Sequence, residues 1–218
     1  QKHNKNILFE GAQGSLLDID HGTYPFVTSS NTTSAQASIG SGLGSIKNSF
    51  TLGITKSYLT RVGEGPFPSE QKNDIGEKLG RLGNEFGTVT GRKRRCGWLD
   101  TVLLKQAVSI SGIDGIALTK LDVLDSFKKI KICISYNYKG KNYDYLPLTL
   151  GNEEEITKHY IEFDGWNKET KGCRNYSDLP ENAKKYISNL EKILGIPVTL
   201  LSTSPEREDT ILLENPFS

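Results

Sequence analysis

The chain has 218 residues, and its 27 lysines and arginines almost balance its 26 aspartates and glutamates. This length allows one sizeable core, and the balance excludes the global basic field that drives nucleic-acid binding, so local basic clusters are interpreted as sites. No apolar run approaches the roughly 18 residues that span a bilayer, and the polar start has no hydrophobic signal core. Three scattered cysteines without metal-ligand spacing favour a reducing compartment. We therefore expect a cytoplasmic protein that binds neither membrane nor nucleic acid.

Hydrophobic periodicity and turn residues predict alternating strands and helices along the chain. The first part should contain a buried strand that opens into a glycine-rich turn, a longer strand, an amphipathic helix and a second helix: Asn6–Glu10, Phe50–Val62, Glu70–Leu82 and Trp98–Ile110. The rest should contain a strand, an antiparallel hairpin, a helix and a last strand: Gly115–Asp122, Lys129–Tyr145, Asp178–Leu194 and Val198–Leu201. This order predicts a mixed α/β fold with a largely parallel sheet, flanking helices and one antiparallel hairpin.

Two further segments are interpreted as structural. The tyrosines of the hairpin could stack on single-stranded bases, but solvated cross-strand pairs are the commoner explanation. These tyrosines are Tyr136, Tyr138, Tyr143 and Tyr145. Residues 151–173 are polar and irregular, and they predict a surface excursion without an assigned function.

Four consecutive cations, Arg92–Arg95, stand directly behind a segment rich in glycine and threonine, residues 87–91. Glycine lets the backbone approach a ligand closely, threonine adds a small hydroxyl, and the arginine fork matches carboxylate or phosphate oxygens. A solvated basic turn or a nucleic-acid patch is the alternative, since charge runs are usually solvated. Phe86 and Trp98 flank the run and could anchor it on a packed body. We therefore favour a small-anion site on this loop.

Two polar turns follow the first expected strand. Gln13 lies in the glycine-rich turn, where its amide can donate to and accept from the edge of a purine, although a plain turn residue is the alternative. Asp18, Asp20 and His21 invite a metal or general-base interpretation, but this pattern more often caps turns. The hydroxyl-rich run Thr28–Thr33 could cap a helix, and its free hydroxyls could hold a phosphate.

The strand that begins at Gly115 ends in Thr119, Lys120 and Asp122. An aspartate can accept two parallel N–H bonds from N1 and the 2-amino group of guanine, while the lysine stem covers the base. Adenine lacks both donors, so an unpaired carboxylate would disfavour it. A Lys-x-Asp pattern alone is common, but after a strand it indicates a guanine site.

Together these segments resemble the adenylosuccinate synthetase family. The resemblance runs in the family's order from Ile7 to Phe217 and implies the family's phosphate-loop NTPase-like α/β fold. It also implies the family's reaction, in which GTP drives the ligation of L-aspartate to IMP through 6-phosphoryl-IMP, giving adenylosuccinate, GDP and phosphate. The matching blocks are FEGAQG (9–14), LDIDHGTYP (17–25), TSSNTT (28–33), RVGEGPFP (61–68), GTVTGRKRR (87–95), GWLD (97–100), ALTKLDVLD (117–125) and STSP (202–205).

The resemblance assigns roles to residues of this chain. The residues implied at IMP are Gln13, Thr28, Val62 and Arg92, of which Gln13 and Arg92 are also expected to be catalytic. The residues implied at the aspartate carboxylates are Thr88, Val89, Thr90, Gly91, Arg92, Lys93 and Arg94. The residues implied at GTP are Arg94, Lys120, Leu121, Asp122, Ser202, Thr203 and Ser204, and the family usually has glycine in place of the last.

The family's glycine-rich phosphate loop, and the aspartate and histidine that act as its base and acid, have no match in this sequence. The resemblance therefore implies that residues 1–218 are the C-terminal portion of a single catalytic domain. Magnesium is expected as the cofactor, with ligands in the other portion and none here. We accordingly expect no turnover by this chain alone, and a homodimer in the full-length protein.

Two rival functions would use the same residues. A non-catalytic guanine-nucleotide-binding module would keep Lys120 and Asp122 but leave Arg92 and Arg94 without a carboxylate ligand. An RNA-binding module would use the basic loop and the hairpin tyrosines, and its affinity would fall steeply with salt. The nearly neutral net charge disfavours the RNA-binding module.

Overall fold

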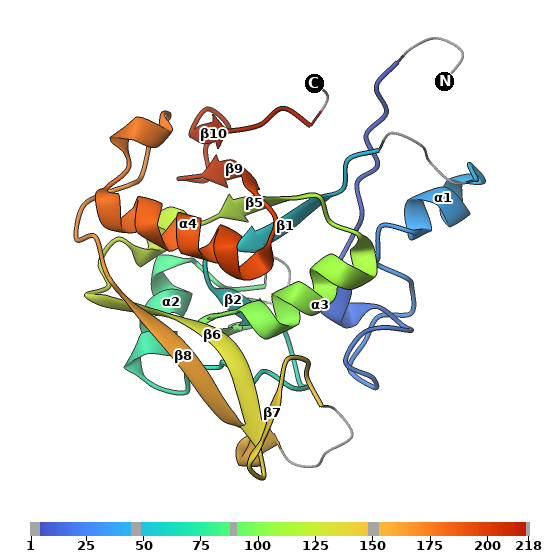
Figure 1. The fold of residues 1–218 in the computed structure, drawn as a ribbon, viewed down its shortest axis with the longest axis horizontal. Helices are drawn as coiled ribbons and strands as arrows, with labels where there is room; N and C mark the ends of the chain where they lie inside the picture. Colours follow the sequence, from blue (N-terminus) through green and yellow to red (C-terminus); the bar gives the residue numbers. More distant parts are fainter. Residues whose placement is uncertain (1–4, 45–48, 88–90, 148–152, 217–218) are drawn as a thin grey trace.

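The computed structural model describes residues 5–44, 49–87, 91–147 and 153–216. Within these residues the chain alternates between strands and helices, as expected from the sequence (Figure 1). The α-helices are α1 (Gln36–Ser41), α2 (Asp74–Leu82), α3 (Thr101–Ser111) and α4 (Glu181–Leu194), and the 3-10 helices are η1 (Ser15–Leu17), η2 (Leu121–Leu124), η3 (Glu153–Glu155) and η4 (Tyr176–Asp178). The strands are β1 (Leu52–Lys56), β2 (Leu59–Arg61), β3 (Arg95–Gly97), β4 (Leu99–Asp100), β5 (Gly115–Thr119), β6 (Lys129–Tyr138), β7 (Lys141–Tyr143), β8 (Thr157–Asp164), β9 (Val198–Ser202) and β10 (Thr210–Leu212).

The main sheet has the strand order β1-β5-β9-β10. β1, β5 and β9 run parallel, and β10 closes the sheet as an antiparallel edge. Every residue of β5 from Gly115 to Leu118 is buried, which suits a central strand covered on both faces. The expected mixed α/β fold with a largely parallel sheet is therefore confirmed.

A second sheet is built around the long strand β6. β8 pairs with β6 in antiparallel register along most of its length, while β7 forms the hairpin and β4 pairs in parallel. The predicted hairpin is confirmed, with its turn at Lys139 and Gly140, both at positive φ. β2 and β3 form a separate antiparallel pair.

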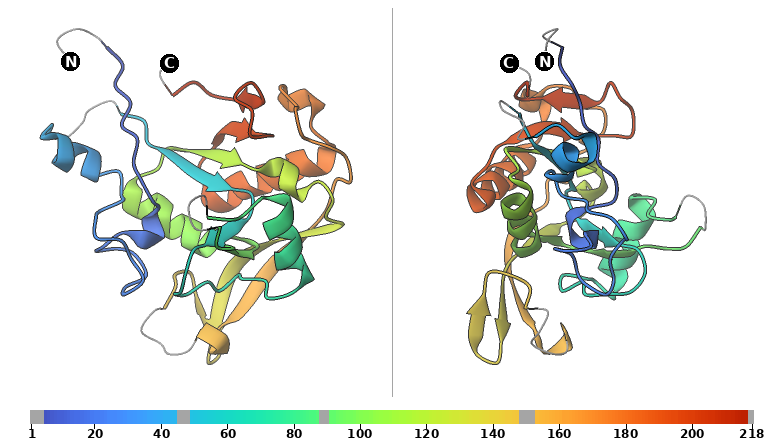
Figure 2. Two further views of the ribbon diagram at one scale, coloured as in Figure 1. Left: turned by 180° about the vertical axis from the view of Figure 1, so that it is seen from behind. Right: turned by 90° about the vertical axis from the view of Figure 1, so that its right-hand side faces the viewer.

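Helices α3 and α4 cover one face of the main sheet. They lie in front of it in Figure 1 and behind it in the reversed view of Figure 2, where α2 comes to the front. The main core lies between these layers and includes the fully buried Leu118 and Tyr186. The hydroxyl of Tyr186 on α4 donates to the backbone oxygen of Ser57, just after β1, at 2.8 Å. This contact fixes the helix layer to the end of the sheet where β1 stops.

The helix boundaries follow from their capping residues. Asn73 caps α2 through its side-chain oxygen, and Asp100 caps α3 by accepting from two backbone N–H groups, at 3.1 and 3.4 Å. Gly112 and Gly195 end α3 and α4 in the left-handed conformation. The helix expected from Trp98 thus begins three residues later, because the chain first pairs as β4.

Two expected strands differ in the structure. Asn6–Glu10 forms no strand in the described residues and is exposed, with Leu8 79% accessible. An apolar run becomes a strand only when a neighbouring strand pairs with its backbone, and no strand among the described residues pairs with this run. The single strand expected over Phe50–Val62 is divided into β1 and β2 by a bend at Ser57.

The segment predicted to be an irregular excursion, 151–173, contains β8. The hairpin tyrosines also differ from the expected solvated pairs. Tyr136 lies opposite Tyr143, as expected for a cross-strand pair, but Tyr136 is fully buried and donates to Asp100 Oδ2 at 2.6 Å. Its role is to join the hairpin to the cap of α3.

The three cysteines, Cys96, Cys133 and Cys173, are free thiols, and the first two are buried. Among the described residues, no helix combines the length and the apolar character that crossing a membrane requires.

Candidate active site

Parallel strands of the main sheet end at one edge, and polar side chains gather there. Lys56 ends β1, and its register partner on β5 is Thr119, which Lys120 follows. β9 runs parallel to β5, so Ser202 at the end of β9 lies at the same edge. Ligands of open parallel sheets bind outside the carboxyl ends of the strands, which makes this edge the candidate site.

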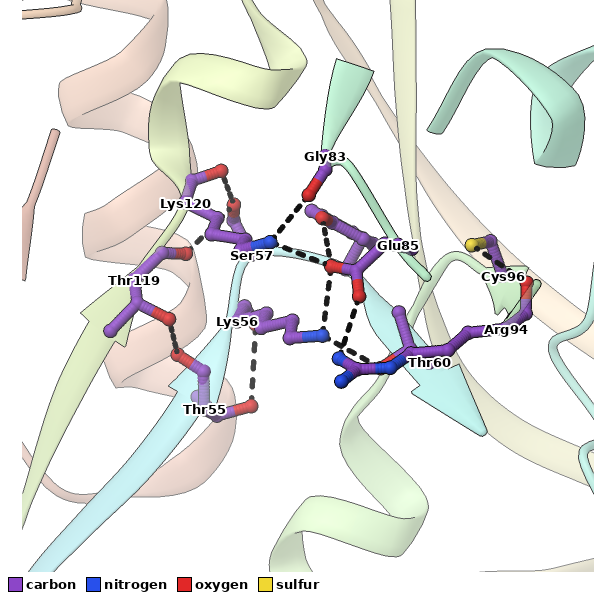
Figure 3. A network of polar contacts seen from close by, with 11 residues as sticks. Thr55, Lys56, Ser57, Thr60, Gly83, Glu85, Arg94, Cys96, Thr119 and Lys120 are labelled. Carbon is purple, nitrogen blue, oxygen red and sulfur yellow. Dashed lines mark hydrogen bonds and ion pairs between the residues drawn. The ribbon is translucent and has the colours of Figure 1, made fainter. Parts of the chain in front are cut away.

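A fully buried carboxylate, Glu85, organises this edge (Figure 3). Its Oε1 accepts hydrogen bonds from Lys56 Nζ at 2.8 Å, Tyr58 OH at 2.6 Å and Lys120 Nζ at 2.9 Å. Its Oε2 accepts from Arg94 Nη1 at 2.9 Å. Three cations and a hydroxyl therefore replace the water that this charge would otherwise hold.

The pKa values of the cluster reflect this arrangement. Burial by itself raises the pKa of Glu85, but the hydrogen bonds from the two lysines and Tyr58 outweigh burial and bring it to about 2. Burial lowers the pKa of Lys56, and Glu85 partly offsets this. Burial and the bond to the carboxylate both raise the pKa of Tyr58. Glu85 is therefore ionised at neutral pH, and the cluster carries more positive than negative charge.

The loop with the four cations folds back as an antiparallel turn. Phe86 bridges to Lys93, and Gly87 N donates to Arg92 O at 2.8 Å. Gly91 has a φ of 62°, in the left-handed region that favours glycine, and its N donates to Gly87 O at 2.8 Å. The residues of this loop that lie outside the described part of the chain are Thr88, Val89 and Thr90.

The four cations differ in their partners. Arg95 makes a two-point pair with Glu70, with Nε and Nη2 at 2.9 and 2.6 Å from its oxygens. Lys93 pairs with an exposed glutamate of α2. Arg94 reaches the buried carboxylate of the sheet edge, and its Nε is buried without a hydrogen-bond partner among the described residues. Arg92 is exposed. Arg95 is thus a structural residue, a distinction that the sequence alone does not make.

The predicted guanine segment lies against the same carboxylate. Lys120 has a φ of 58°, and its Nζ donates to Gly83 O at 2.6 Å as well as to Glu85. Leu121 is fully buried and begins η2, which carries Asp122. Burial, and next the charge of Asp125, raise the pKa of the half-buried Asp122.

Asp122 lines an open cleft of about 520 Å³. The opposite wall comes from the turn after β8, which Asp125 holds in place. Asp125 Oδ1 accepts from Trp166 Nε1 and Thr170 Oγ1, and Oδ2 accepts from Thr170 N, each at 2.7 Å. The residues that line the cleft are Leu82, Asp122, Asp125, Ser126, Asn167, Lys168 and Glu169.

The side chains of Ser202–Ser204 are bonded within the protein. Ser202 Oγ donates to Ser204 O at 2.9 Å, and Ser204 Oγ donates to Asp209 Oδ2 at 2.7 Å. Thr203 is fully buried and donates to Cys173 O at 2.9 Å. These side-chain hydrogen bonds therefore shape the turn after β9.

Two residues predicted at IMP lie together. Thr28 and Val62 both line a cleft of about 350 Å³, with Arg61 in its wall. Arg61 is buried and donates to Thr23 Oγ1 at 2.8 Å, which holds the 23–28 turn against β2. Gln13 is exposed, has a φ of 62°, and does not belong to the described residues that line this cleft.

The acidic pattern after the first expected strand is a turn cap. Asp18 Oδ1 accepts from Asp20 N at 2.9 Å and His21 N at 3.0 Å, and Oδ2 accepts from Thr32 N at 2.5 Å. Burial raises the pKa of Asp18, but these backbone N–H groups outweigh it and bring the pKa to about 2. The capping interpretation is confirmed.

Comparisons with known proteins bear on the family to which this chain belongs. A family model described as adenylosuccinate synthetase matches residues 1–211. The fully ligated adenylosuccinate synthetase of Plasmodium falciparum is 42% identical to this chain, with a TM-score of 0.91 over 98% of this chain and 51% of that one. The chain belongs to the adenylosuccinate synthetase family.

A second solved structure has a similar fold but a much lower sequence identity to this chain. It is the succinoaminodeoxyadenylate synthetase of cyanophage S-2L, 17% identical, with a TM-score of 0.55 over 95% of this chain and 46% of that one. The chain therefore spans about half the length of the structures that it matches.

The expectation that the magnesium ligands lie outside this chain stays a prediction. Among the residues that the structure describes, no three His, Cys, Asp or Glu side chains gather in a group that could hold a metal ion.

Sequence reasoning missed three members of the site: Glu85, Lys56 and Tyr58. One signal was available, because Glu85 is the acid that immediately precedes a basic loop. The two others come from the β1–β2 bend, and only the fold brings them to the carboxylate.

Proposed function

We propose that this chain supplies the IMP, L-aspartate and guanine-binding segments of an adenylosuccinate synthetase that ligates aspartate to IMP at the expense of GTP. The observation that carries the proposal is the shared carboxylate. Arg94 of the expected aspartate loop and Lys120 of the expected guanine segment both bond to Glu85. Two motifs assigned separately therefore meet at one strand edge, as a reaction between their ligands requires.

The proposed chemistry proceeds in two steps. The 6-oxygen of IMP is a poor leaving group, so the γ-phosphoryl group of GTP is first transferred to it, which forms 6-phosphoryl-IMP and releases GDP. The aspartate amine then attacks C6, the C–O bond breaks and phosphate leaves. Both steps concentrate negative charge, and positioned cations lower their barriers.

The cations at the sheet edge suit this task. Lys56, Arg94 and Lys120 exceed Glu85 in charge, and their side chains are 23, 30 and 35% exposed, so part of each can face a ligand. The aspartate ligands proposed from the family are Thr88, Val89, Thr90, Gly91, Arg92, Lys93 and Arg94.

The proposed base specificity rests on Asp122. Asp122 follows Lys120 by two residues and lines the cleft, where its carboxylate can accept from N1 and the 2-amino group of guanine. The Ser202–Ser204 turn completes the guanine side. The residues proposed at IMP are Gln13, Thr28, Val62 and Arg92, and the shared cleft of Thr28 and Val62 supports two of them.

The proposal extends to the full-length protein. We expect magnesium ligands outside this chain, a homodimer, and a cytoplasmic location, for which the three free cysteines are the support. We also propose that these 218 residues alone do not turn over.

The test is an assay of adenylosuccinate formation from IMP, aspartate and GTP. The full-length protein that contains this chain should form the product only when all three substrates are present, and this chain alone should form none. Replacement of GTP by ATP without loss of rate would contradict the guanine assignment. Turnover by the isolated chain would contradict the proposal that these 218 residues alone are inactive.

A further inference from the structure

Glu85 bonds to residues of two sites at once. Resting on the proposed function for the ligands of those sites, we propose that Glu85 is a positioning residue that couples aspartate binding to guanine-nucleotide binding. It touches neither ligand in this account. It acts through Arg94 on one side and Lys120 on the other.

The backbone around Glu85 leaves its side chain little freedom. Its N–H donates to Gly80 O at 2.8 Å, and its carbonyl oxygen accepts from Arg94 N at 2.9 Å. The main chain is thus tied to α2 before it and to the cation loop after it. Because the side chain is also fully buried, the carboxylate cannot turn toward water when one partner leaves.

The two oxygens divide the partners between the sites. Oε2 holds Arg94, while Oε1 holds Lys120 together with Lys56 and Tyr58. The loop residue and the guanine-side lysine are therefore joined through one carboxyl group. Hydrogen bonds on the same buried group polarise one another, so a change in the bond at one oxygen alters the strength of the bonds at the other.

The sign of the coupling follows from the charges. A dicarboxylate ligand that draws on the Arg94 guanidinium weakens the Arg94–Glu85 bond. The hydrogen bond from Lys120 Nζ to the buried carboxylate then becomes stronger. This bond holds in place the lysine stem that is expected to cover the base. Aspartate should therefore raise the affinity for guanine nucleotide, and by linkage the nucleotide should raise the affinity for aspartate by the same factor.

Matched variants separate coupling from simple stabilisation. Glu85→Gln removes the shared charge, and Glu85→Asp keeps the charge on a side chain too short to reach both cations. Glu77→Gln is the control. Glu77 lies exposed on α2 and pairs with Lys93, which belongs to the same loop as Arg94. Its replacement therefore also frees a loop cation but leaves the bonds of Glu85 intact.

The test is calorimetric titration of the full-length protein with GDP, without and with saturating aspartate. In the wild type and in Glu77→Gln, aspartate should tighten GDP binding by several fold. In Glu85→Gln and Glu85→Asp this factor should fall to one, while each ligand alone still binds. A wild-type factor of one, or an unchanged factor in both Glu85 variants, overturns the coupling while the proposed function stands.

A ligand-free measurement keeps the two proposals distinguishable. Arg94→Met, Lys120→Met and the double variant are compared by urea unfolding, in the wild type and in the Glu85→Gln background. With Glu85 present, the changes in unfolding free energy caused by Arg94→Met and by Lys120→Met should be non-additive in the double variant. In the Glu85→Gln background the two changes should add. Additivity in both backgrounds overturns the bridge, whereas a wild type that binds neither ligand contradicts the proposed function.

Discussion

Glu85 and Asp100 are both fully buried carboxylates, but their surroundings move their pKa values in opposite directions. Burial raises both. At Glu85, lysines and Tyr58 outweigh burial and bring the pKa to about 2. At Asp100, the hydroxyl of Tyr136 and the backbone N–H groups of the helix cap only partly offset burial, and the pKa rises to about 6. The charges of the partners, rather than the depth of burial, decide the direction.

This difference predicts a pH dependence that belongs to Asp100. Its folded pKa of about 6 lies above the ordinary value of 3.8, so its contribution to stability is complete below pH 4 and is lost as pH rises through 6. The shift corresponds to about 3 kcal/mol. Asp100→Asn can keep the cap but does not titrate. Urea unfolding from pH 4 to 7 should therefore show wild-type stability falling relative to the variant, and parallel curves would contradict this.

At the scale of the elements, α2 and the site meet at two glycines with different surroundings. A Cβ on Gly83 would lie 2.0 Å from the hydroxyl of Tyr58, whereas a Cβ on Gly80 would meet nothing closer than Cys96 Sγ at 3.5 Å. The first position is open only to glycine because the Tyr58–Glu85 bond occupies the space. The second is an ordinary helix position.

We therefore expect opposite outcomes for two alanine substitutions. Gly83→Ala should displace the Tyr58 hydroxyl from Glu85 and cost about 1–3 kcal/mol of unfolding free energy. Gly80→Ala should be neutral or stabilising by up to about 1 kcal/mol, because alanine favours the helix. Thermal and urea unfolding of both variants provide the measurement, and an equal effect at the two positions would contradict the packing described.

The turn after β8 depends on a single acid. Asp125→Asn replaces one of the two oxygens that accept from Trp166 and Thr170 with an NH2 donor. We therefore expect a loss of about 1–3 kcal/mol of unfolding free energy and faster hydrogen exchange over residues 165–170. Asp144→Asn, at an exposed position of the hairpin, is the control. Unchanged exchange in the first variant would show that the wall of the Asp122 cleft does not need this residue.

At the scale of the whole molecule, periodicity predicted the elements whose burial is local. α2, α3, α4 and β5 each carry their own apolar pattern, and the structure confirms them. β8 was missed because both of its faces are largely exposed and only its pairing with β6, a distant strand, makes it a strand. The strand predicted over Asn6–Glu10 was wrong for the converse reason. The run is apolar, but no strand among the described residues pairs with it.

The candidate site likewise has one part that the sequence predicts and another that only the fold reveals. The cation run and the Thr-Lys-x-Asp segment were visible as local motifs. Their common partner was not, because Glu85, Lys56 and Tyr58 are brought together only by the sheet and by the end of α2. Nor could the sequence show that Arg95 is held by Glu70 while its neighbour Arg94 faces the site.

The most direct test of the account is calorimetric titration of this chain with GDP and with ADP, repeated on Asp122→Ala and on the control Asp144→Ala. We expect binding of GDP and not ADP, retained in the control and lost in Asp122→Ala, because the carboxylate accepts from two donors that only guanine offers. Equal binding of ADP, or undiminished GDP binding by Asp122→Ala, would contradict the guanine site and the assignment built on it.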